Sequence, residues 1–520
     1  MPYSMMDSDS DETRSDKSES STTSDEPDAN EWEWDVDNSN FSSTFDYFDG
    51  RALGDNVVRP IDAFSKYISQ DIIELIVDQT NIYGKNRYVQ KGKKSTDWKE
   101  IDTAQMHAFL GILLIMGFHK LPRIRDYWST DRNLFTPAVA NVMTRNEFQR
   151  IFSNIHLVDN TKMPSKNISK RDKLYKVHDF LVMLKRNFQK NYSLGSCVSI
   201  DEAMIKFKGR SSLKQFQPLK PTKRGYKVWV LAESTTGYVY NFEIYTGKST
   251  ERSGPLGEHV IMSLISGINL KNRQLFFDSF FSSITLLYNL RRKRIGATCT
   301  IRSNRKNFPI ELKKDEHLNR GDYQYLASNG ISIVKWMDKK EVFVASNYFD
   351  PEESEEVTRG NKDGTKSRII CPLPIVQYNK YMGGVDLSDQ KTKYYTIDRK
   401  SKRNWIRIFF RFLGIALINS LIYYKNLSPD NINTVEYISS ISTTLTGDYF
   451  GRKRAGRPLA LSNQKKIPHM PEVISTRRRC VYCSTKEKEK RTDVMCTFCG
   501  VCLCVKNCFL LYHQNYVCRQ

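Results

Sequence analysis

The chain has 520 residues, with 80 Lys and Arg against 58 Asp and Glu, which gives a formal net charge of +22. It is too long for a single small module, and 39% hydrophobic with 12% aromatic residues can form a large core, which excludes wholesale disorder. Residues 1–50 hold fifteen acidic and two basic residues, so residues 51–520 carry +35 and favour a polyanionic partner. Nucleic acid is the first candidate and an anionic membrane surface the second.

The first segment of the chain is acidic. Residues 1–55 are rich in Ser, Asp and Glu and show no apolar periodicity before Trp32, which predicts a disordered tail. The tail either solubilises the protein or mimics DNA and competes for its basic surface. Met1 to Asp11 contains neither the basic nor the apolar stretch of a secretory signal, so an intracellular protein is expected.

Two stretches have helical apolar spacing. Residues 56–195 predict the first part of a helical domain, in which Asp102 or Thr103 caps one helix. Residues 396–450 predict its second part. The longest apolar run, Ile408 to Tyr424, contains an arginine and is shorter than the roughly 20 apolar residues of a membrane span, so we expect a core helix.

Between these helical parts the pattern changes to short strands. Strands are predicted at 198–207, 228–232, 238–245, 275–277 and 297–302, the first three antiparallel. A polar stretch with short β-like runs follows. The sequence therefore predicts an α/β core of residues 196–302 and 370–395, interrupted by an insertion domain of residues 303–369.

Three carboxylates stand at edges of this predicted core. Asp201 and Asp278 each end an apolar run, and Asp386 follows Gly383 and Gly384 at the start of a helix. A cluster of such carboxylates needs compensating cations, and hard oxygen ligands select Mg²⁺, as in two-metal phosphoryl transfer. A single Asp in such a place is more often a turn or capping residue, so only the joint layout carries weight. The glycine pair predicts positive φ angles or close approach of the backbone to DNA.

The residues around these carboxylates resemble the piggyBac transposase family. The resemblance covers residues 60–520, and the matching stretches include Ser199–Glu202, Phe207–Arg210, Phe277–Ser283, Tyr378–Gln390, Arg403–Trp405, Ile418–Ser420 and the C-terminal cysteines. It implies an RNase H-like catalytic core embedded in a helical DNA-binding and dimerisation domain. It also implies Mg²⁺-dependent cut-and-paste transposition of double-stranded DNA at TTAA sites by a homodimer. The implied metal-binding carboxylates are Asp201, Asp278 and Asp386, with Asp389 as a fourth catalytic acid.

Several basic and aromatic residues are candidates for contacts with DNA. They are Lys208 and Arg210 after the first strand, Arg302, Arg305 and Lys306 after the strand at 297–302, and Arg403 with Trp405 in a basic run. Cations bind phosphates, and an indole stacks on an unpaired base. The alternatives are solvated turns for the cations and a core anchor for Trp405.

The C-terminal segment, residues 479–520, is rich in cysteine. Two CxxC pairs, Cys480 with Cys483 and Cys496 with Cys499, indicate zinc, since each pair can chelate one ion. A cross-braced arrangement predicts two structural zinc ions. The first would be held by Cys480, Cys483, Cys504 and Cys508, and the second by Cys496, Cys499, His513 and Cys518. Cys502 would be spare or would replace Cys504.

A basic, proline-containing stretch, residues 451–478, leads into this module and predicts a linker. Its cations are typical of a nuclear localisation patch or of a phosphate-binding linker, so a nuclear protein is expected. The resemblance favours an active transposase, because all four positions that correspond to the family's catalytic acids are Asp in this chain. The alternative is a domesticated DNA-binding or chromatin protein without transposition activity.

Overall fold

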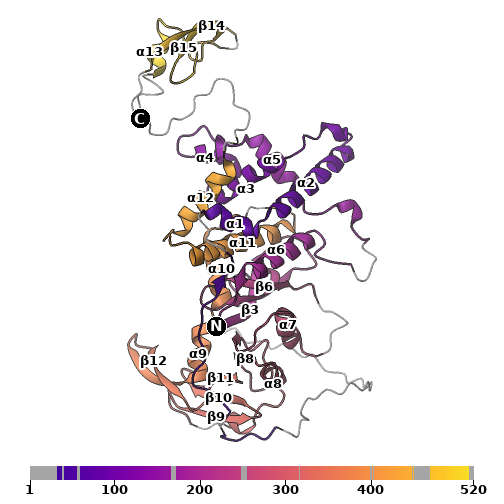
Figure 1. Cartoon of the computed structure of the whole chain (residues 1–520), viewed down its shortest axis with the longest axis vertical. Coiled ribbons are helices and arrows are strands. Elements are labelled where there is room, and N and C mark those ends of the chain that lie inside the picture. The colour runs from indigo at the N-terminus through magenta and orange to yellow at the C-terminus, as the bar shows by residue number, and fades with distance from the viewer. Residues whose placement is uncertain are drawn as a thin grey trace, which may run out of the picture. The chain divides into compact units, whose positions relative to one another are not determined.

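The computed structural model describes residues 32–37, 40–54, 59–165, 171–218, 220–247, 254–314, 317–398, 401, 403–447, 449, 469–485 and 487–513. The chain divides into two compact units, which are described separately. The larger unit comprises Phe45–Phe281 and Gln377–Gln520, and the smaller unit comprises Met1–Thr44 and Ser282–Val376. Figure 1 shows the helices and strands of both.

Helices make up much of the larger unit, as predicted for residues 56–195 and 396–450. They are α1 (Pro60–Tyr67), α2 (Gln70–Gln90), η1 (Ser95–Asp97), α3 (Thr103–Phe118), η2 (Ile124–Trp128), α4 (Pro137–Ala140), α5 (Arg145–Asn154), η3 (Asn160–Lys162), α6 (His178–Lys190), α7 (Leu256–Ile265), α10 (Gly384–Tyr394), α11 (Ile406–Leu427) and α12 (Thr434–Thr446). Asp102 caps α3 as predicted: its carboxylate accepts from the Gln105 amide at 2.7 Å, and the Gln105 side chain bonds back to the Asp102 N–H. α12 packs on α3, and α1 packs on α11.

Helix α11 is the one helix of the described residues that is long and apolar enough to cross a membrane. Its most apolar 18-residue window is 89% buried inside the protein, so it is the core helix that the sequence predicted. Two of its polar side chains are satisfied within the core. Asn419 bonds to both backbone groups of Val239, and Ser420 accepts from the Tyr437 hydroxyl.

A mixed sheet forms the centre of the larger unit. Its strands are β3 (Cys197–Lys206), β4 (Gln215–Phe216), β5 (Arg224–Glu233), β6 (Val239–Ile244) and β7 (Gln274–Phe277). β5 pairs antiparallel with β3 on one side and with β6 and β4 on the other, which confirms the three predicted antiparallel strands, whereas β7 pairs parallel with β3. This order is that of an RNase H-like core. The helices cover the sheet face that carries Ala203, Ile205, Val228 and Val230.

The smaller unit is an antiparallel sheet with one helix and a separate hairpin. The sheet has the order β8 (Gly296–Thr300), β11 (Glu341–Ser346), β10 (Ile331–Met337) and β9 (Tyr323–Ser328), with α8 (Ile284–Arg292) and η4 (Glu311–Lys313) beside it. The hairpin is β12 (Ser354–Gly360) with β13 (Lys366–Pro372), which α9 (Leu373–Tyr381) follows. The second segment of this unit, Ser282–Val376, starts ahead of residue 303, because β8 pairs with β11 of the same sheet. The insertion domain of residues 303–369 stays a prediction.

The acidic segment is ordered from Trp32 onward wherever the structure describes it, so the predicted disordered tail of residues 1–55 is too long. Asp35 exchanges two backbone hydrogen bonds with Ala327 of the edge strand β9, at 2.9 and 2.6 Å. The Trp32 ring packs edge-on against Tyr288 at 6.0 Å. An edge strand has unpaired backbone groups, and the two contacts explain why this part orders. Farther along, in the larger unit, β1 (Arg51–Ala52) pairs with β2 (Tyr192–Ser193).

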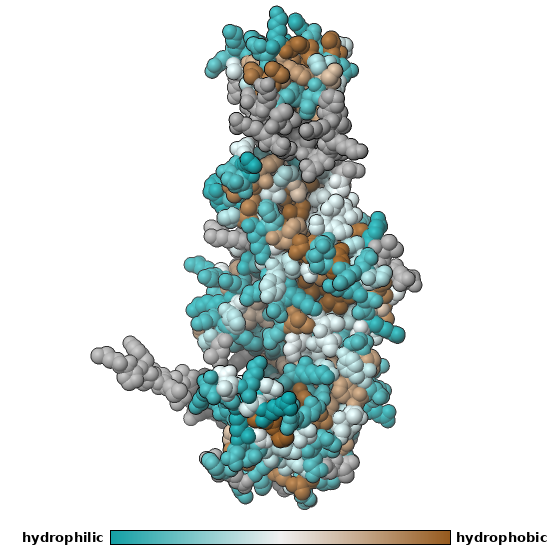
Figure 2. Space-filling model, turned by 90° about the vertical axis from the view of Figure 1, so that its left-hand side faces the viewer, coloured by the Kyte–Doolittle hydropathy of each residue, from teal (hydrophilic) through white to brown (hydrophobic). Residues whose placement is uncertain are grey.

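The cysteine-rich module contains β14 (Pro471–Arg479), β15 (Arg491–Cys496) and α13 (Cys508–Tyr512). β14 pairs with β15, so the end of the predicted linker, residues 471–478, is a strand of the module; residues 451–468 lie outside the described part. Several apolar side chains of the module are exposed, among them Val473 at 77% and Leu510 at 63%. Figure 2 shows hydrophobic residues on its surface. A module with so little buried apolar area needs metal to be stable.

Candidate active site and metal centres

The pairing of β3 with β7 brings two of the predicted carboxylates side by side. The two strands are parallel, with Ile200 opposite Phe277, and the next residue on each is Asp201 and Asp278. Asp201 does not end its strand, as the sequence suggested, but lies in the middle of the ten-residue β3. Asp278 follows the last residue of β7, where its Oδ1 accepts from the Phe280 amide at 3.0 Å.

Asp386 comes from the first turn of α10, which packs on β3 and β5. Neither Gly383 nor Gly384 has a positive φ, so the first of the two predicted alternatives is wrong, while close approach to DNA stays a prediction. Gly384 is needed for close packing: a Cβ there would lie 2.6 Å from both Glu233 O and Ser199 Oγ. The glycine therefore lets the start of α10 approach the sheet, which brings Asp386 toward Asp201.

The β3–β7 register and the packing of α10 on β3 place the three carboxylates at the same edge of the sheet. The pKa of Asp201 is raised to about 6, chiefly by burial and to a smaller extent by the charges of Asp278 and Asp386, while Lys220 and the Glu202 amide act to lower it. Mutual repulsion of this kind is relieved by a bound cation, and the donor set is that of Mg²⁺. Among the described residues, only the cysteine and histidine clusters bring all ligand atoms within 4.8 Å, so the carboxylates form a more open group.

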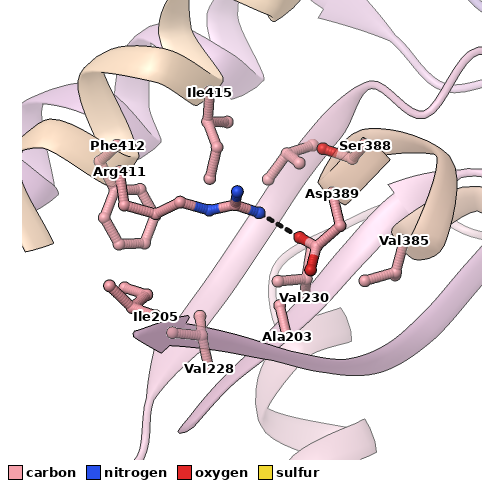
Figure 3. Close-up of a pocket in the computed structure, with 11 residues that line it drawn as sticks. Ala203, Ile205, Val228, Val230, Val385, Ser388, Asp389, Arg411, Phe412 and Ile415 are labelled. Carbon is pink, nitrogen blue, oxygen red and sulfur yellow. Dashed lines mark hydrogen bonds and ion pairs between the residues drawn. The ribbon is translucent and has the colours of Figure 1, made fainter. Parts of the chain in front are cut away.

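Asp389 differs from the other three acids, because it has a cationic partner. Figure 3 shows its carboxylate on α10 directed at Arg411 of α11, with which it forms an ion pair. Ala203, Val230 and other apolar side chains surround the pair. The structure thus assigns Asp389 a contact that holds α10 to α11; its predicted catalytic role stays a prediction.

The basic candidates occupy exposed loops in both units. Lys208 and Arg210 are exposed after β3. Arg302, Arg305 and Lys306 lie in the turn after β8 of the smaller unit, where the Arg305 amide donates to the Arg302 carbonyl at 3.1 Å; Arg302 and Lys306 are exposed and Arg305 is half-buried. Their roles in DNA binding stay predictions.

Arg403 and Trp405 have partners within the protein, and their roles in DNA binding stay predictions. Trp405 is 5% exposed and packs edge-on against His156, which supports the core-anchor alternative. Arg403 donates to the carbonyls of Ile155 and Phe152 at 2.9 and 2.5 Å. Its charge therefore sits at the C-terminal end of α5, where carbonyl oxygens attract cations.

The first predicted zinc site is assembled in the structure. Cys480, Cys483, Cys504 and Cys508 bring their sulfur atoms within 4.8 Å of one another, as the sequence predicted for the first ion. Burial opposes ionisation of Cys480, but backbone N–H groups of Cys483 and Cys504 lower its pKa to about 7. The thiolate is the form that binds metal, so this donor set fits a structural zinc ion.

The second group of ligands contains one residue, His469, that the sequence did not predict. Cys496, Cys499 and His513 form the group with His469, whose Nδ1 lies 3.2 Å from the Cys499 sulfur. The predicted ligand Cys518 lies outside the described residues. His469 was missed because it stands between two prolines in a basic stretch that predicted a linker. A histidine just ahead of a CxxC module is the signal that could have found it.

Cys502 belongs to neither group, in agreement with its predicted status as the spare cysteine. It is buried, it forms an isolated bridge with Met495, and its carbonyl accepts from the Val481 amide at 3.0 Å. Those contacts link the segment around Val481 to the end of β15, so Cys502 contributes to the packing of the module without being a ligand.

Comparison with known proteins agrees with this fold. A model of the family described as Transposase IS4 matches residues 59–421. The human PiggyBac transposable element-derived protein 3 is 28% identical over 475 residues, which cover 88% of this chain and 76% of the relative. The human PiggyBac transposable element-derived protein 2 is 26% identical over 447 residues, covering 82% and 72%.

A solved structure shows the same fold. The piggyBac transposase, determined by cryo-EM in a synaptic complex with hairpin DNA, matches with a TM-score of 0.72 at 23% identity, covering 88% of this chain and 98% of that one. The family model identifies the chain as a transposase by descent. Within that class, the chain belongs to the piggyBac transposase family.

Proposed function

We propose that this chain is an active cut-and-paste DNA transposase, which excises a DNA element and integrates it at TTAA sites. The observation that carries the proposal is the group of Asp201, Asp278 and Asp386, brought together by the β3–β7 register and the close packing of α10. When bound there, two Mg²⁺ ions would activate the attacking oxygen and stabilise the leaving oxygen of a phosphodiester.

The protein's own residues would supply binding and orientation. The carboxylates would hold the ions, and the exposed cations Lys208 and Arg210 on the loop after β3 would bind DNA phosphates. Arg302, Arg305 and Lys306 would bind target DNA from the smaller unit. The two zinc ions would fold the C-terminal module, which would contact the ends of the element. We further propose a nuclear homodimer, in line with the basic linker and the family.

A second function has a specific observation in its favour. Two human relatives are named as transposable element-derived proteins, and each covers more than four-fifths of this chain. A domesticated DNA-binding protein would keep the fold and the basic surface but would not cut DNA. The three acidic positions favour the first function, because a binding protein has no need of them.

An excision assay separates the two functions. The full-length protein is incubated in Mg²⁺ with a plasmid that carries the genomic sequences flanking this reading frame, and the rejoined and released DNA are sequenced. An active transposase should release the fragment and leave a TTAA at the donor joint. Binding without cleavage, in Mg²⁺ and in Mn²⁺, would support the domesticated alternative.

A further inference from the structure

Behind the carboxylates, on the opposite face of the sheet, lies a buried ion pair. Glu202 directly follows Asp201, so its side chain points to the other face of β3. Its Oε2 lies 2.5 Å from Lys227 Nζ of the neighbouring strand β5, and the two side chains are 11% and 8% exposed. A buried pair of this kind is weak evidence for stability, since apolar residues often serve as well. It calls for another role.

The lysine of this pair also contacts the loop that carries Asp278. Lys227 Nζ lies 4.4 Å from the centre of the Phe280 ring, close enough for a cation–π interaction with little water between them. The backbone amide of Phe280 donates to Asp278 Oδ1 at 3.0 Å. A continuous set of contacts therefore runs from Glu202 through Lys227 and Phe280 to Asp278.

The loop is held from its other side as well. A Cβ on Gly257, in the first turn of α7, would lie 2.6 Å from the Phe280 carbonyl oxygen and 2.7 Å from Phe281 Cα. The Phe281 side chain is buried, at 1% exposed. The loop after β7 is thus clamped between α7 and the sheet, and Lys227 is the charged contact on the sheet side.

We propose that Glu202 and Lys227 are positioning residues, which fix the loop bearing Asp278 relative to the strand bearing Asp201. This inference rests on the proposed function, because it assigns a role to the distance between two metal-binding carboxylates. The pair lies on the face of the sheet opposite Asp201. It acts through the Phe280 ring and the Phe280 amide, in the way that outer partners of metal ligands set the geometry of a site.

The test measures Mg²⁺ binding in addition to activity. Mg²⁺ is titrated by calorimetry into the full-length protein bound to a nicked duplex that carries the flanking sequences, and the Mg²⁺ concentration for half-maximal nicking is measured in parallel. Lys227→Met and Phe280→Leu should each weaken Mg²⁺ binding by about 10- to 100-fold. Lys227→Arg keeps a cation at both contacts and should bind Mg²⁺ nearly as the wild type does.

A matched control comes from the same unit. Lys185 Nζ lies 5.3 Å over the Phe242 ring, on α6 and β6, without contact to a candidate metal ligand. Lys185→Met removes a comparable cation–π contact and should leave Mg²⁺ binding unchanged. If Lys227→Met alone misfolds because Glu202 is left buried and unpaired, the double variant Glu202→Gln/Lys227→Met removes both charges and should fold but still bind Mg²⁺ weakly.

Two results would overturn the inference. One is unchanged Mg²⁺ binding in folded Lys227→Met and Phe280→Leu; the other is the same loss of Mg²⁺ binding in Lys185→Met. Asp201→Asn distinguishes this failure from that of the proposed function. If Asp201→Asn loses Mg²⁺ binding while the Lys227 and Phe280 variants keep it, only the positioning role is wrong. If Asp201→Asn itself binds Mg²⁺ normally, the proposed function is wrong.

Discussion

Among single residues, Glu233 is a buried acid whose side chain joins two separate segments of the backbone. It is 1% exposed, and its Oε1 accepts from the amides of Gly50 and Gly195 at 3.1 and 3.0 Å. Burial raises its pKa from 4.5 to about 7, although the Tyr192 hydroxyl and the two amides favour the charged form. The folded state therefore holds this proton more tightly than the unfolded chain does.

The sign of the pH effect follows from that shift. As pH rises from 4.5 through 7, ionising Glu233 lowers the free energy of unfolding, by at most about 3 kcal/mol. Glu233→Gln keeps an acceptor for both amides and removes the charge. Thermal unfolding should show this variant more stable than the wild type above pH 7 and equal to it below pH 4.5. A constant difference at every pH would contradict the assignment.

Gly384 and Gly383 offer a matched pair of substitutions. An alanine Cβ at 384 would lie 2.6 Å from the Glu233 carbonyl oxygen, whereas one at 383 would meet nothing within 4 Å. Gly384→Ala should lower the free energy of unfolding by about 1–3 kcal/mol, the usual cost of overpacking. Gly383→Ala should change it by less than about 1 kcal/mol. Denaturant unfolding curves of equal midpoint for the two variants would show that α10 does not need this close approach.

The candidate carboxylates were predictable from sequence, while some of their neighbours were not. Asp201, Asp278 and Asp386 stand next to apolar runs or glycines, so the pattern that marks them lies within a few residues of each. Asp389 bonds to Arg411, and Trp405 is buried against His156 from a distant segment. Such partners depend on tertiary packing, which the pattern along the chain does not contain.

Among the secondary-structure elements, β14 extends the zinc module beyond the bounds predicted from the sequence. Its pairing with β15 moves the start of the module back to His469, which completes the second group of ligands. The two CxxC pairs were visible in the sequence because they are local. The strand was not, because its partner lies a dozen residues farther on and its own segment contains prolines and many cations.

Zinc content tests the ligand set directly. The full-length protein should contain two zinc ions per chain, measured by mass spectrometry of the metal. His469→Ala should contain one, because the second site keeps only three ligands, while Cys518→Ser should keep two. Loss of one ion from Cys518→Ser and none from His469→Ala would restore the ligand set predicted from the sequence.

At the scale of the whole molecule, the uneven charge predicts how DNA is held. Residues 51–520 carry +35, so binding to DNA should weaken steeply with salt, by a slope of about −0.9 in log K against log salt for each neutralised phosphate.

The division of the chain into two units could not be predicted from composition, because Ser282–Val376 joins elements on both sides of the predicted boundary at residue 303.

Charge supplies affinity, whereas contacts with base edges and DNA shape supply discrimination. Removing residues 469–520 should therefore reduce the preference for the terminal sequences over scrambled duplex more than it reduces binding to scrambled duplex. Fluorescence anisotropy of full-length and truncated protein on both duplexes measures the two effects. An equal proportional loss on both duplexes would mean that the zinc module clamps DNA or stabilises a dimer without reading sequence.

We expect Asp201 on β3, Asp278 directly after β7 and Asp386 on α10 to hold the metal ions that cut DNA. The most direct test of this expectation is nicking of the plasmid that carries the flanking sequences, by purified Asp201→Asn, Asp278→Asn and Asp386→Asn in Mg²⁺, with exposed Asp62→Asn as the control and DNA binding measured alongside. Each of the three substitutions should nearly abolish nicking and leave binding intact, while Asp62→Asn should cut as the wild type does. Wild-type nicking by any one of the three would contradict the role assigned to that residue, and wild-type nicking by all three would contradict the proposed function.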